Sequence, residues 1–288
     1  MSTHAGAQAR HQDSTVDRAV SKGKSKSSKP AAILSGPAGL VAASTSPPDL
    51  TYWVLAKRGR AENLQLIDRV SGKVQAIVPE STAADAIAEV PAGPLLVGRA
   101  TATAGSLEFH SSTSGALGSS VALSGPVRGI AVSANGATIN ALIVTAKSSS
   151  VEVISATSHS VVDTFPLPGQ ASRAIVMDDA RDSLFVLVGD QAVDEINATS
   201  GQVESQFNVP PAARAIAMST DGTVLYVLRA QGSVFNVSEF KVATEAQFGA
   251  LPAAAHSVGL QVTSDGHYLG DFVGTSKIGN IQFFALPK

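Results

Sequence analysis

Short apolar segments separated by turn residues recur at nearly constant spacing along this chain. The clearest copy lies between Ala212 and Val237 and contains three apolar runs, Ala215–Met218, Val224–Leu228 and Val234–Val237. The residues between the runs include Asp221-Gly222 and Gln231-Gly232, and Gly accepts the positive φ that tight turns require. Runs this short, bounded by turn residues, predict antiparallel strands rather than helices.

The same pattern can be aligned six times. The segments that begin the copies are Ala38–Val41, Asp85–Ala88, Arg128–Ala131, Arg173–Val176, Arg214–Ala217 and His256–Gly259, and successive starts lie 47, 43, 45, 41 and 42 residues apart. A second turn marker keeps the same period, at Ser71-Gly72, Ser114-Gly115, Ser158-His159 and Ser200-Gly201. Repeats of about 40–45 residues that carry four short strands are typical of propeller blades.

We therefore predict an all-β fold over residues 31–288, a β-propeller of six blades with four antiparallel strands each. The last copy holds only three predicted strands, Val258–Val262, Tyr268–Val273 and Ile281–Leu286. Pairing the spare apolar segment Ala31–Leu34 with the last of these would supply the fourth strand and close the ring. Seven blades, the alternative, would need about 40 further residues. The first strands are apolar at consecutive positions, so we expect neighbouring blades to cover both their faces.

Composition narrows the possible functions. The chain has no Cys, which excludes disulfides and thiolate metal sites, and no apolar run approaches the ~18 residues of a membrane-spanning helix. Residues 1–30 hold six Lys/Arg and two Asp/Glu, and we expect them to form a disordered basic tail. They lack the apolar centre of a secretory signal. Residues 31–288 carry a net charge of −6, which does not favour a nucleic-acid partner.

The repeat resembles the YVTN-type β-propeller repeat. The match is clearest at Ile216–Val227, which combines a small–aliphatic strand, Ser219-Thr220-Asp221-Gly222 and a Tyr-Val pair, and at Asn197–Val203, which reads Asn-Ala-Thr-Ser-Gly-Gln-Val. The resemblance covers residues 31–288, although most copies lack the Tyr-Val tetrad. It implies a propeller related to bacterial surface and envelope proteins, lactonase-like enzymes and quinoprotein-type or haem-d1-type propellers. The resemblance also favours a location outside the cytoplasm. The lack of a secretory signal in residues 1–30 favours the opposite.

The repeat places the starts of the first strands around one channel mouth. The aligned residues are Ala38, Asp85, Arg128, Arg173, Arg214 and His256, and the loops between second and third strands add Lys57, Arg58, Arg60, Arg99, Lys147, Asp190 and Arg229. Arg side chains bind carboxylate or phosphate through paired hydrogen bonds, and a concave surface concentrates their field. We predict an anion-binding site formed by Arg128, Arg173, Arg214, His256, Asp85, Arg229 and Arg99. In the structural alternative, the Arg residues cap carbonyls or pair with Asp85 and Asp190 between blades.

Catalytic and metal sites have weaker support. A lactonase-like hydrolase would need Asp85, Glu89 and His256 to converge in the channel, while His110, His159 and His267 fall where we expect solvent exposure. The acidic run Asp178–Asp182 has the density of a calcium loop but is expected to be an exposed turn. We therefore expect a monomeric, non-enzymatic binding propeller without cofactor or metal. Its expected partner is an anionic small molecule, acidic protein or glycan. A lactonase-like hydrolase and a structural envelope protein are the alternatives.

Overall fold

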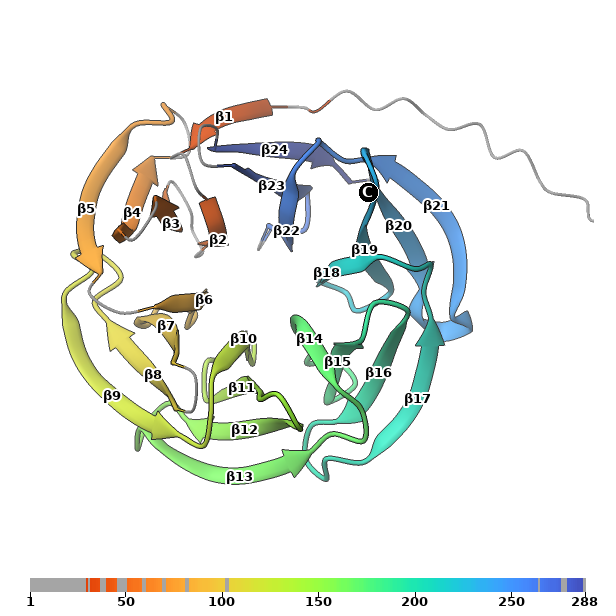
Figure 1. Ribbon diagram of the computed structural model, residues 1–288, viewed down its shortest axis with the longest axis horizontal. Coiled ribbons are helices and arrows are strands. Elements are labelled where there is room, and N and C mark those ends of the chain that lie inside the picture. Colours follow the sequence, from red (N-terminus) through yellow and green to blue (C-terminus); the bar gives the residue numbers. More distant parts are fainter. Residues whose placement is uncertain are drawn as a thin grey trace, which may run out of the picture.

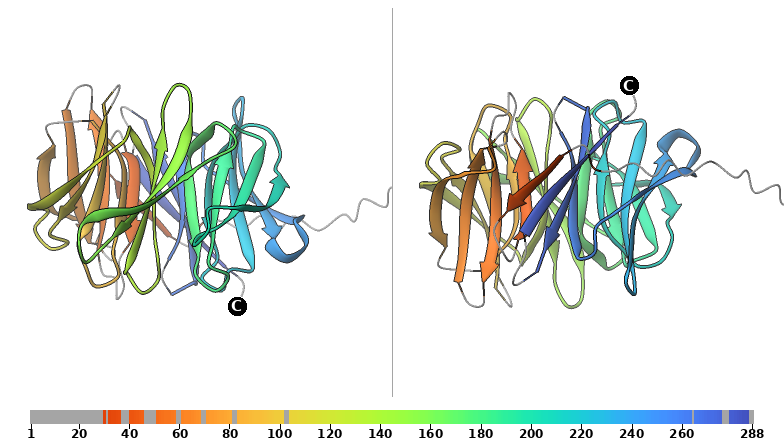
Figure 2. Two further views of the ribbon diagram at one scale, coloured as in Figure 1. Left: turned by 90° about the horizontal axis from the view of Figure 1, so that it is seen from below. Right: turned by 90° about the horizontal axis from the view of Figure 1, so that it is seen from above.

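The chain forms six four-stranded antiparallel sheets that stand around a common axis, and it is a six-bladed β-propeller (Figure 1). The computed structural model describes residues 30, 32–36, 40–45, 51–58, 61–68, 71–80, 83–101, 104–263, 265–275 and 279–286. Within residues 32–45, and at Arg58, Ala61, Glu80, Ser172 and Arg173, this description covers the backbone alone. Of the predicted tail, only Pro30 lies inside the described residues. Seen from the side, the ring is a thick disc (Figure 2).

Five blades each take four consecutive strands, ordered from the axis outward (Figure 1). Blade 1 contains β2 (Leu40–Thr45), β3 (Thr51–Arg58), β4 (Ala61–Asp68) and β5 (Val74–Glu80). Blade 2 contains β6 (Ala84–Glu89), β7 (Leu95–Ala100), β8 (Gly105–His110) and β9 (Leu117–Leu123). Blade 3 contains β10 (Val127–Val132), β11 (Thr138–Val144), β12 (Ser149–Ser155) and β13 (Ser160–Pro166).

Blades 4 and 5 follow the same plan. Blade 4 contains β14 (Ala171–Asp178), β15 (Ser183–Val188), β16 (Ala192–Asn197) and β17 (Val203–Asn208). Blade 5 contains β18 (Ala213–Met218), β19 (Val224–Gln231), β20 (Val234–Lys241) and β21 (Ala246–Pro252). The short 3-10 helix η1 (Val242–Thr244) connects β20 to β21.

Blade 6 joins the two ends of the ring. It contains β22 (Ser257–Val262), β23 (Tyr268–Gly274) and β24 (Gly279–Ala285), and its outer strand is β1 (Ala32–Gly36). β1 runs antiparallel to β24, with Ala32 opposite Phe283 and Leu34 opposite Ile281. The predicted six blades and the predicted closing strand are therefore confirmed.

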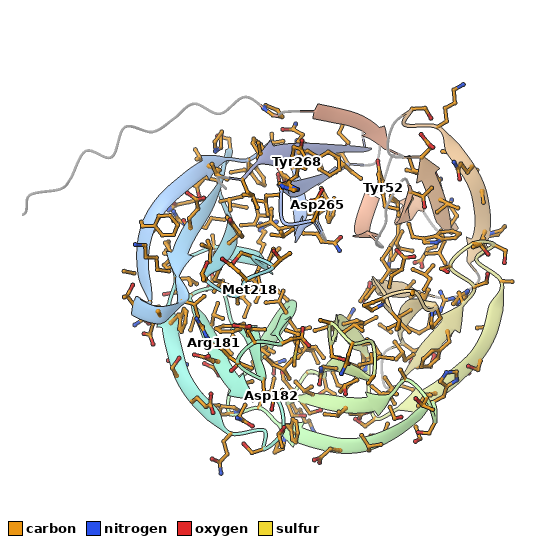
Figure 3. All side chains as sticks on the ribbon, turned by 180° about the vertical axis from the view of Figure 1, so that it is seen from behind. Tyr52, Arg181, Asp182, Met218, Asp265 and Tyr268 are labelled. Atoms are coloured by element: carbon orange, nitrogen blue, oxygen red, sulfur yellow. The ribbon has the colours of Figure 1, made fainter. Side chains whose placement is uncertain are left out.

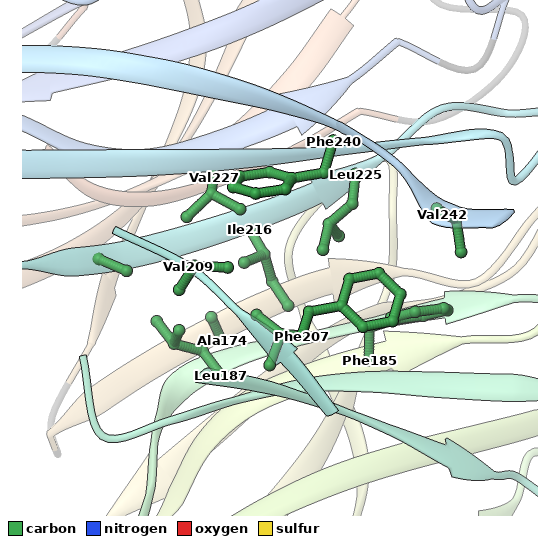
Figure 4. Close-up of a cluster of buried hydrophobic side chains, with 12 residues drawn as sticks. Ala174, Phe185, Leu187, Phe207, Val209, Ile216, Leu225, Val227, Phe240 and Val242 are labelled. Carbon is green, nitrogen blue, oxygen red and sulfur yellow. The ribbon is translucent and has the colours of Figure 1, made fainter. Parts of the chain in front are cut away.

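The apolar core lies between the blades. Buried apolar side chains of the described residues form six clusters, one at each interface between neighbouring blades. Between blades 4 and 5, Phe185 and Phe207 pack with Ile216, Leu225 and Phe240 (Figure 4). The two phenyl rings of blade 4 meet edge to face, with centroids 5.7 Å apart. Each sheet is thus covered on both sides by its neighbours.

Burial differs between the first and second strands. All residues of β7 are buried, and in β15 only Val188 is half-buried. The first strands are less covered, since in β10 buried and half-buried residues alternate. Neighbouring blades nevertheless cover both faces of the first strands, as expected. In β18, Ile216 belongs to the apolar cluster shared with blade 4, and Ala215 and Ala217 belong to the cluster shared with blade 6.

The turns between third and fourth strands pack against the preceding blade. Gly201, with φ of 70°, lies over Phe165 of blade 3, and Gly115, also at φ of 70°, lies over Trp53 of blade 1. In blade 3 the corresponding residue is His159, whose ring stacks on Phe109 of blade 2 with centroids 3.9 Å apart. The recurring Ser-Gly marker therefore identifies a turn that needs both a positive φ and close approach to an aromatic ring.

Replacing Gly201 by Ala will test this double requirement. An added Cβ would lie 2.4 Å from the Phe165 ring, in addition to the backbone strain of a positive φ, so we expect Gly201→Ala to lower the free energy of unfolding by about 2–4 kcal/mol. Gly189→Ala is the matched control, because Gly189 has φ of 59° but no neighbour within 4 Å of the added Cβ. Chemical denaturation should show a clearly larger loss for Gly201→Ala. Equal losses would contradict the packing role.

Candidate functional site

One face of the ring, which we call the start face, carries the first residues of the innermost strands. Near that face every blade has the same irregularity, a register shift between its first and second strands. In five blades the shift skips a single residue, at Val41, Asp85, Arg128, Arg214 and Val258. In blade 4 it spans Ser172–Ala174 and so includes Arg173. A bulge redirects a side chain away from the regular pleat, so these positions form a ring around the axis.

Asp85 pairs with two cationic side chains that lie near these bulge positions. Its Oδ2 accepts a hydrogen bond from Arg128 Nη1 of blade 3, and its Oδ1 accepts one of 2.9 Å from Lys57 Nζ of blade 1. Lys57 also lies 3.3 Å from Glu62, which in turn accepts the backbone N–H of Ala84 at 2.8 Å. Side chains of three consecutive blades are therefore connected through one carboxylate. This pairing corresponds to the structural alternative for Asp85 and Arg128.

Blade 5 places two further predicted residues on the start face. Arg214 is exposed, and its guanidinium has no hydrogen bond or ion pair among the described residues. Arg229 is half-buried and lies opposite Ala213, the neighbour of Arg214. Its Nε donates to the carbonyl of Pro211 at 3.3 Å, and no described carboxylate pairs with it. Asp190, expected as a partner for Arg, instead accepts the backbone N–H of Ala212 at 3.2 Å.

The alignment of the last blade is corrected by two residues. The register places Val258, rather than His256, at the position that corresponds to Arg128 and Arg214. His256 precedes β22 in a turn, with φ of 69°, and its exposed ring lies 6.2 Å from the ring of Phe235. Arg173 belongs to β14 at the start face, where only its backbone is described. Ala38 and Arg60 lie outside the described residues.

Arg99 does not belong to the exposed surface, which corrects another expectation. Its side chain is buried between blades 1 and 2, where Nη2 bonds Glu108 at 2.6 Å. The same Glu108 oxygen accepts from His110 Nε2 at 2.9 Å, and the other ring nitrogen of His110 faces the carbonyl of Gly115 at 2.9 Å. His110, expected in solvent, is thus also buried. Burial tends to raise the pKa of the Glu108 carboxyl, but the bonds and charges of Arg99 and His110 outweigh burial and lower it.

This cluster predicts a pH dependence of stability. Because the pKa of Glu108 is lower in the folded chain, the carboxylate stabilises the fold at neutral pH, and this contribution is lost as the pH falls below 4.5 through the folded pKa. Glu108→Gln leaves Arg99 buried without its anion, so we expect a loss of about 3 kcal/mol at pH 7. The difference between wild type and variant should shrink in acid. The exposed Glu245→Gln is the control, and a constant difference across pH would contradict the ion pair.

A second buried carboxylate, Asp271, lies in the closing blade. It is fully buried, and its Oδ2 accepts from Ala254 N–H at 3.0 Å and Ser257 Oγ at 2.9 Å, while Oδ1 has no hydrogen-bond partner in the part of the chain that the structure describes. Burial raises the pKa of Asp271, more than the hydrogen bonds from Ala254 and Ser257 lower it. Carboxyl groups with a shifted pKa often mark reactive sites. The hydrogen bonds from Ala254 and Ser257 instead give Asp271 a structural role, because they hold the turn before β22. The sequence analysis did not single out Asp271. A signal was present, because the equivalent positions of blades 5 and 4 hold the apolar residues Val227 and Val186.

Replacing Asp271 by Asn tests the cost of this buried charge. A raised pKa in the folded chain means that stability is lost as the pH rises from the ordinary value of 3.8 through the folded pKa. Asn keeps the acceptor oxygen without the charge, so Asp271→Asn should raise the melting temperature at pH 7 and lose that advantage in acid. Asp163→Asn, at an exposed position of β13, should leave the melting temperature unchanged both at pH 7 and in acid. A lower melting temperature for Asp271→Asn at pH 7 would contradict the argument.

The opposite face, which carries the turns between first and second strands, holds the acidic run. Asp178 is buried and bonds Ala180 N–H at 3.1 Å, and Asp179 accepts Ala134 N–H of blade 3 at 2.7 Å. Asp182 accepts the Thr199 hydroxyl at 2.6 Å. In Figure 3, Asp265 lies near the centre of the ring and Asp182 farther out. Within the described part of the chain, no three His, Asp or Glu side chains are placed to hold a metal ion.

Comparisons with known proteins identify the fold and leave the family open. No protein-family model matches the sequence, and no curated protein matches it. A chain in the crystal structure of the mitotic checkpoint complex has a TM-score of 0.66 at 14% identity, covering 100% of both chains. A chain of Kuenenia stuttgartiensis hydrazine synthase has a TM-score of 0.61 at 14% identity, covering 88% of this chain and 97% of that chain. They show the fold alone. The predicted YVTN-type membership is not confirmed.

Among the residues that the structure describes, none forms a helix with the length and hydrophobicity of a membrane span.

Proposed function

We propose that this protein is a binding scaffold that recognises an acidic segment of a partner protein on the start face of blades 4 and 5. The observation that supports this most directly is the charge of Arg214 and Arg229, two neighbouring cations of blade 5 without a carboxylate partner among the described residues. Arg128 and Lys57, by contrast, both bond Asp85. We also infer that residues 31–288 act as one domain, because β1 and β24 belong to one sheet.

The order of residues around the ring concentrates this charge. Asp85 is the carboxylate at the bulge positions, and Arg128, Arg173 and Arg214 follow in blades 3, 4 and 5. Arg128 is next to Asp85, while Arg214 follows a second Arg and precedes Val258. An exposed guanidinium such as that of Arg214 binds carboxylates through paired, charge-assisted hydrogen bonds. An acidic partner would therefore be attracted to blades 4 and 5 more strongly than to blades 2 and 3.

Similar propellers occur both in a protein assembly and in an enzyme. One similar chain is part of the mitotic checkpoint complex, so this architecture serves in a protein assembly. The similar chain in hydrazine synthase belongs to an enzyme. A propeller fold therefore does not decide between binding and catalysis, and the proposal stands on the residues of the start face.

Binding of a labelled polyglutamate peptide, followed by fluorescence anisotropy, tests the proposal. We expect the wild-type protein to bind this peptide, with an affinity that falls as salt concentration rises. The double variant Arg214→Gln/Arg229→Gln should bind at least about tenfold more weakly, since each charge-assisted hydrogen bond contributes roughly 1.5–3 kcal/mol. A heparin fragment and inorganic phosphate serve as competitors. They report whether a glycan or a small anion occupies the same surface.

Lys73→Gln provides a charge control, which removes one positive charge where the double variant removes two. Lys73 is exposed in the turn between β4 and β5, on the face opposite the start face, so its replacement changes net charge but not the proposed site. The melting temperature of every variant should equal that of the wild type. Polyglutamate affinity that is equal in wild type and double variant, or lowered equally by Lys73→Gln, would overturn the proposal.

A further inference from the structure

Blade 6 lacks the turn that connects third and fourth strands in the other blades. Its third strand β24 pairs with β1, which precedes blade 1 in the sequence. In blades 2 and 4 this turn packs on the preceding blade, with Gly115 on Trp53 and Gly201 on Phe165. Trp53 also gains a hydrogen bond there, because its Nε1 donates to the carbonyl of Ser112 at 2.8 Å. No described turn supplies such contacts to blade 5 at its boundary with blade 6.

Blade 5 presents a hydroxyl and a carboxyl group at this boundary. Tyr226 of β19 corresponds in register to Trp53, and it belongs to the buried cluster shared with blade 6. Glu239 of β20 is directly opposite Tyr226, so it lies on the same face of the sheet, and it is half-buried. Among the described residues, neither the hydroxyl of Tyr226 nor the carboxyl of Glu239 has a hydrogen bond or ion pair.

The equivalent carboxylate of blade 4 has a partner that Glu239 lacks. Glu195 occupies the same position on β16, and its Oε2 accepts a hydrogen bond from the hydroxyl of Ser205, the residue opposite, at 3.0 Å. In blade 5 the residue opposite Glu239 is Gly249, which has no side chain. The carboxylate of Glu239 lies over Gly249, where an added Cβ would clash with Oε2. We call Tyr226, Glu239 and Gly249 the blade 5 rim.

The charge around Glu239 is negative on balance. Burial and the charges of Glu239 and Asp221 raise the pKa of Tyr226 to about 12, so both carboxylates lie near its hydroxyl. Burial also raises the pKa of Glu239. Lys241, two residues farther along the same face, lies over the exposed ring of Phe248 instead, with Nζ 5.7 Å from the ring centroid. A further cation would therefore pair with a half-buried carboxylate that no described residue neutralises.

The start of β1 points to the source of this cation. Ala32 is opposite Phe283, and in register this pair corresponds to Ser205 and Glu195 of blade 4. Gly201, which packs on the preceding blade, comes four residues before Ser205. By the same count, we expect the residues that lead into Ala32 to meet the blade before blade 6, which is blade 5. Figure 1 shows β1 beginning on the side of blade 5 and running toward blade 1.

The residues that lead into β1 also have the complementary charge. Residues 21–29 contain four Lys and no Asp or Glu, and the others are Ser and Gly. We propose that this segment binds to the blade 5 rim in the place of the missing turn, with a Lys ammonium group paired to the carboxylate of Glu239. Ser and Gly are also the residues of the corresponding turns in blades 2 and 4. These turns lie on the face opposite the start face, so the inference does not depend on the proposed function.

Carbodiimide cross-linking of the full chain tests the inference, because this reagent joins a Lys amine to a carboxylate only where the two are in contact. Mass spectrometry of the peptides identifies each linked pair. We expect residues 21–29 to be linked to Glu239 about tenfold more often than to Glu195, with a yield that falls as salt concentration rises. Glu239→Gln should remove the link. Glu195→Gln is the matched control and should retain it.

Trypsin cleavage of the same proteins measures binding of the segment without the reagent. A bound segment is cleaved slowly, so Glu239→Gln should accelerate cleavage after Lys24 and Lys26 about tenfold. Arg10 lies outside the proposed segment, and cleavage after it should keep its rate in both variants. Glu195→Gln should leave all of these rates unchanged.

Three results would overturn the inference. Links from residues 21–29 that are spread equally over many carboxylates would exclude a specific site. Links between labelled and unlabelled copies, in a mixture of isotope-labelled and unlabelled protein, would assign the rim to a second chain. Cleavage after Lys24 that is as fast in the wild type as in Glu239→Gln would show that Glu239 does not hold the segment.

Discussion

Each sheet of this propeller has two apolar faces, and neither can remain exposed to water. In an isolated blade the side chains of Phe185 and Leu184 would point in opposite directions without cover. Stacking the sheets face to face in a line would still leave two uncovered ends, and only a ring covers every face. This requirement fixes the architecture. It also brings residues from distant parts of the sequence to one rim, because equivalent positions of successive blades must then be neighbours.

The rim has an uneven charge as a consequence. Equivalent positions in neighbouring blades face each other, so a carboxylate in one blade pairs with a cation in the next, as Asp85 does with Arg128. Buried or half-buried pairs of this kind connect the blades. Among the residues that the structure describes, no carboxylate pairs with Arg214, and an apolar residue, Val258, holds the corresponding position in the next blade. The recognition surface that we propose lies in the sector in which this pairing between blades is interrupted.

Sequence reasoning predicted the architecture well because the period and the turn chemistry are local signals. The spacing of the turns, the absent fourth strand and the spare segment Ala31–Leu34 were enough for six blades and their closure. The site was predicted less completely. Arg99 was expected in the loop between the second and third strands, but it lies inside β7, where strand alternation puts it on the same face as Leu95 and Val97, in the blade 1–2 interface. Connections of variable length likewise hid the two-residue offset between His256 and Val258.

The pairing of β1 with β24 has a consequence for biosynthesis. β1 leaves the ribosome before the other described strands, yet its partner β24 ends only at Ala285, after the strands of five other blades. Blades 1 to 5 each consist of consecutive strands and can assemble as they emerge, whereas the closing sheet must wait until β24 has been synthesised. During translation the apolar flank of the first blade is therefore open to other contacts, and a chaperone would have its longest opportunity there.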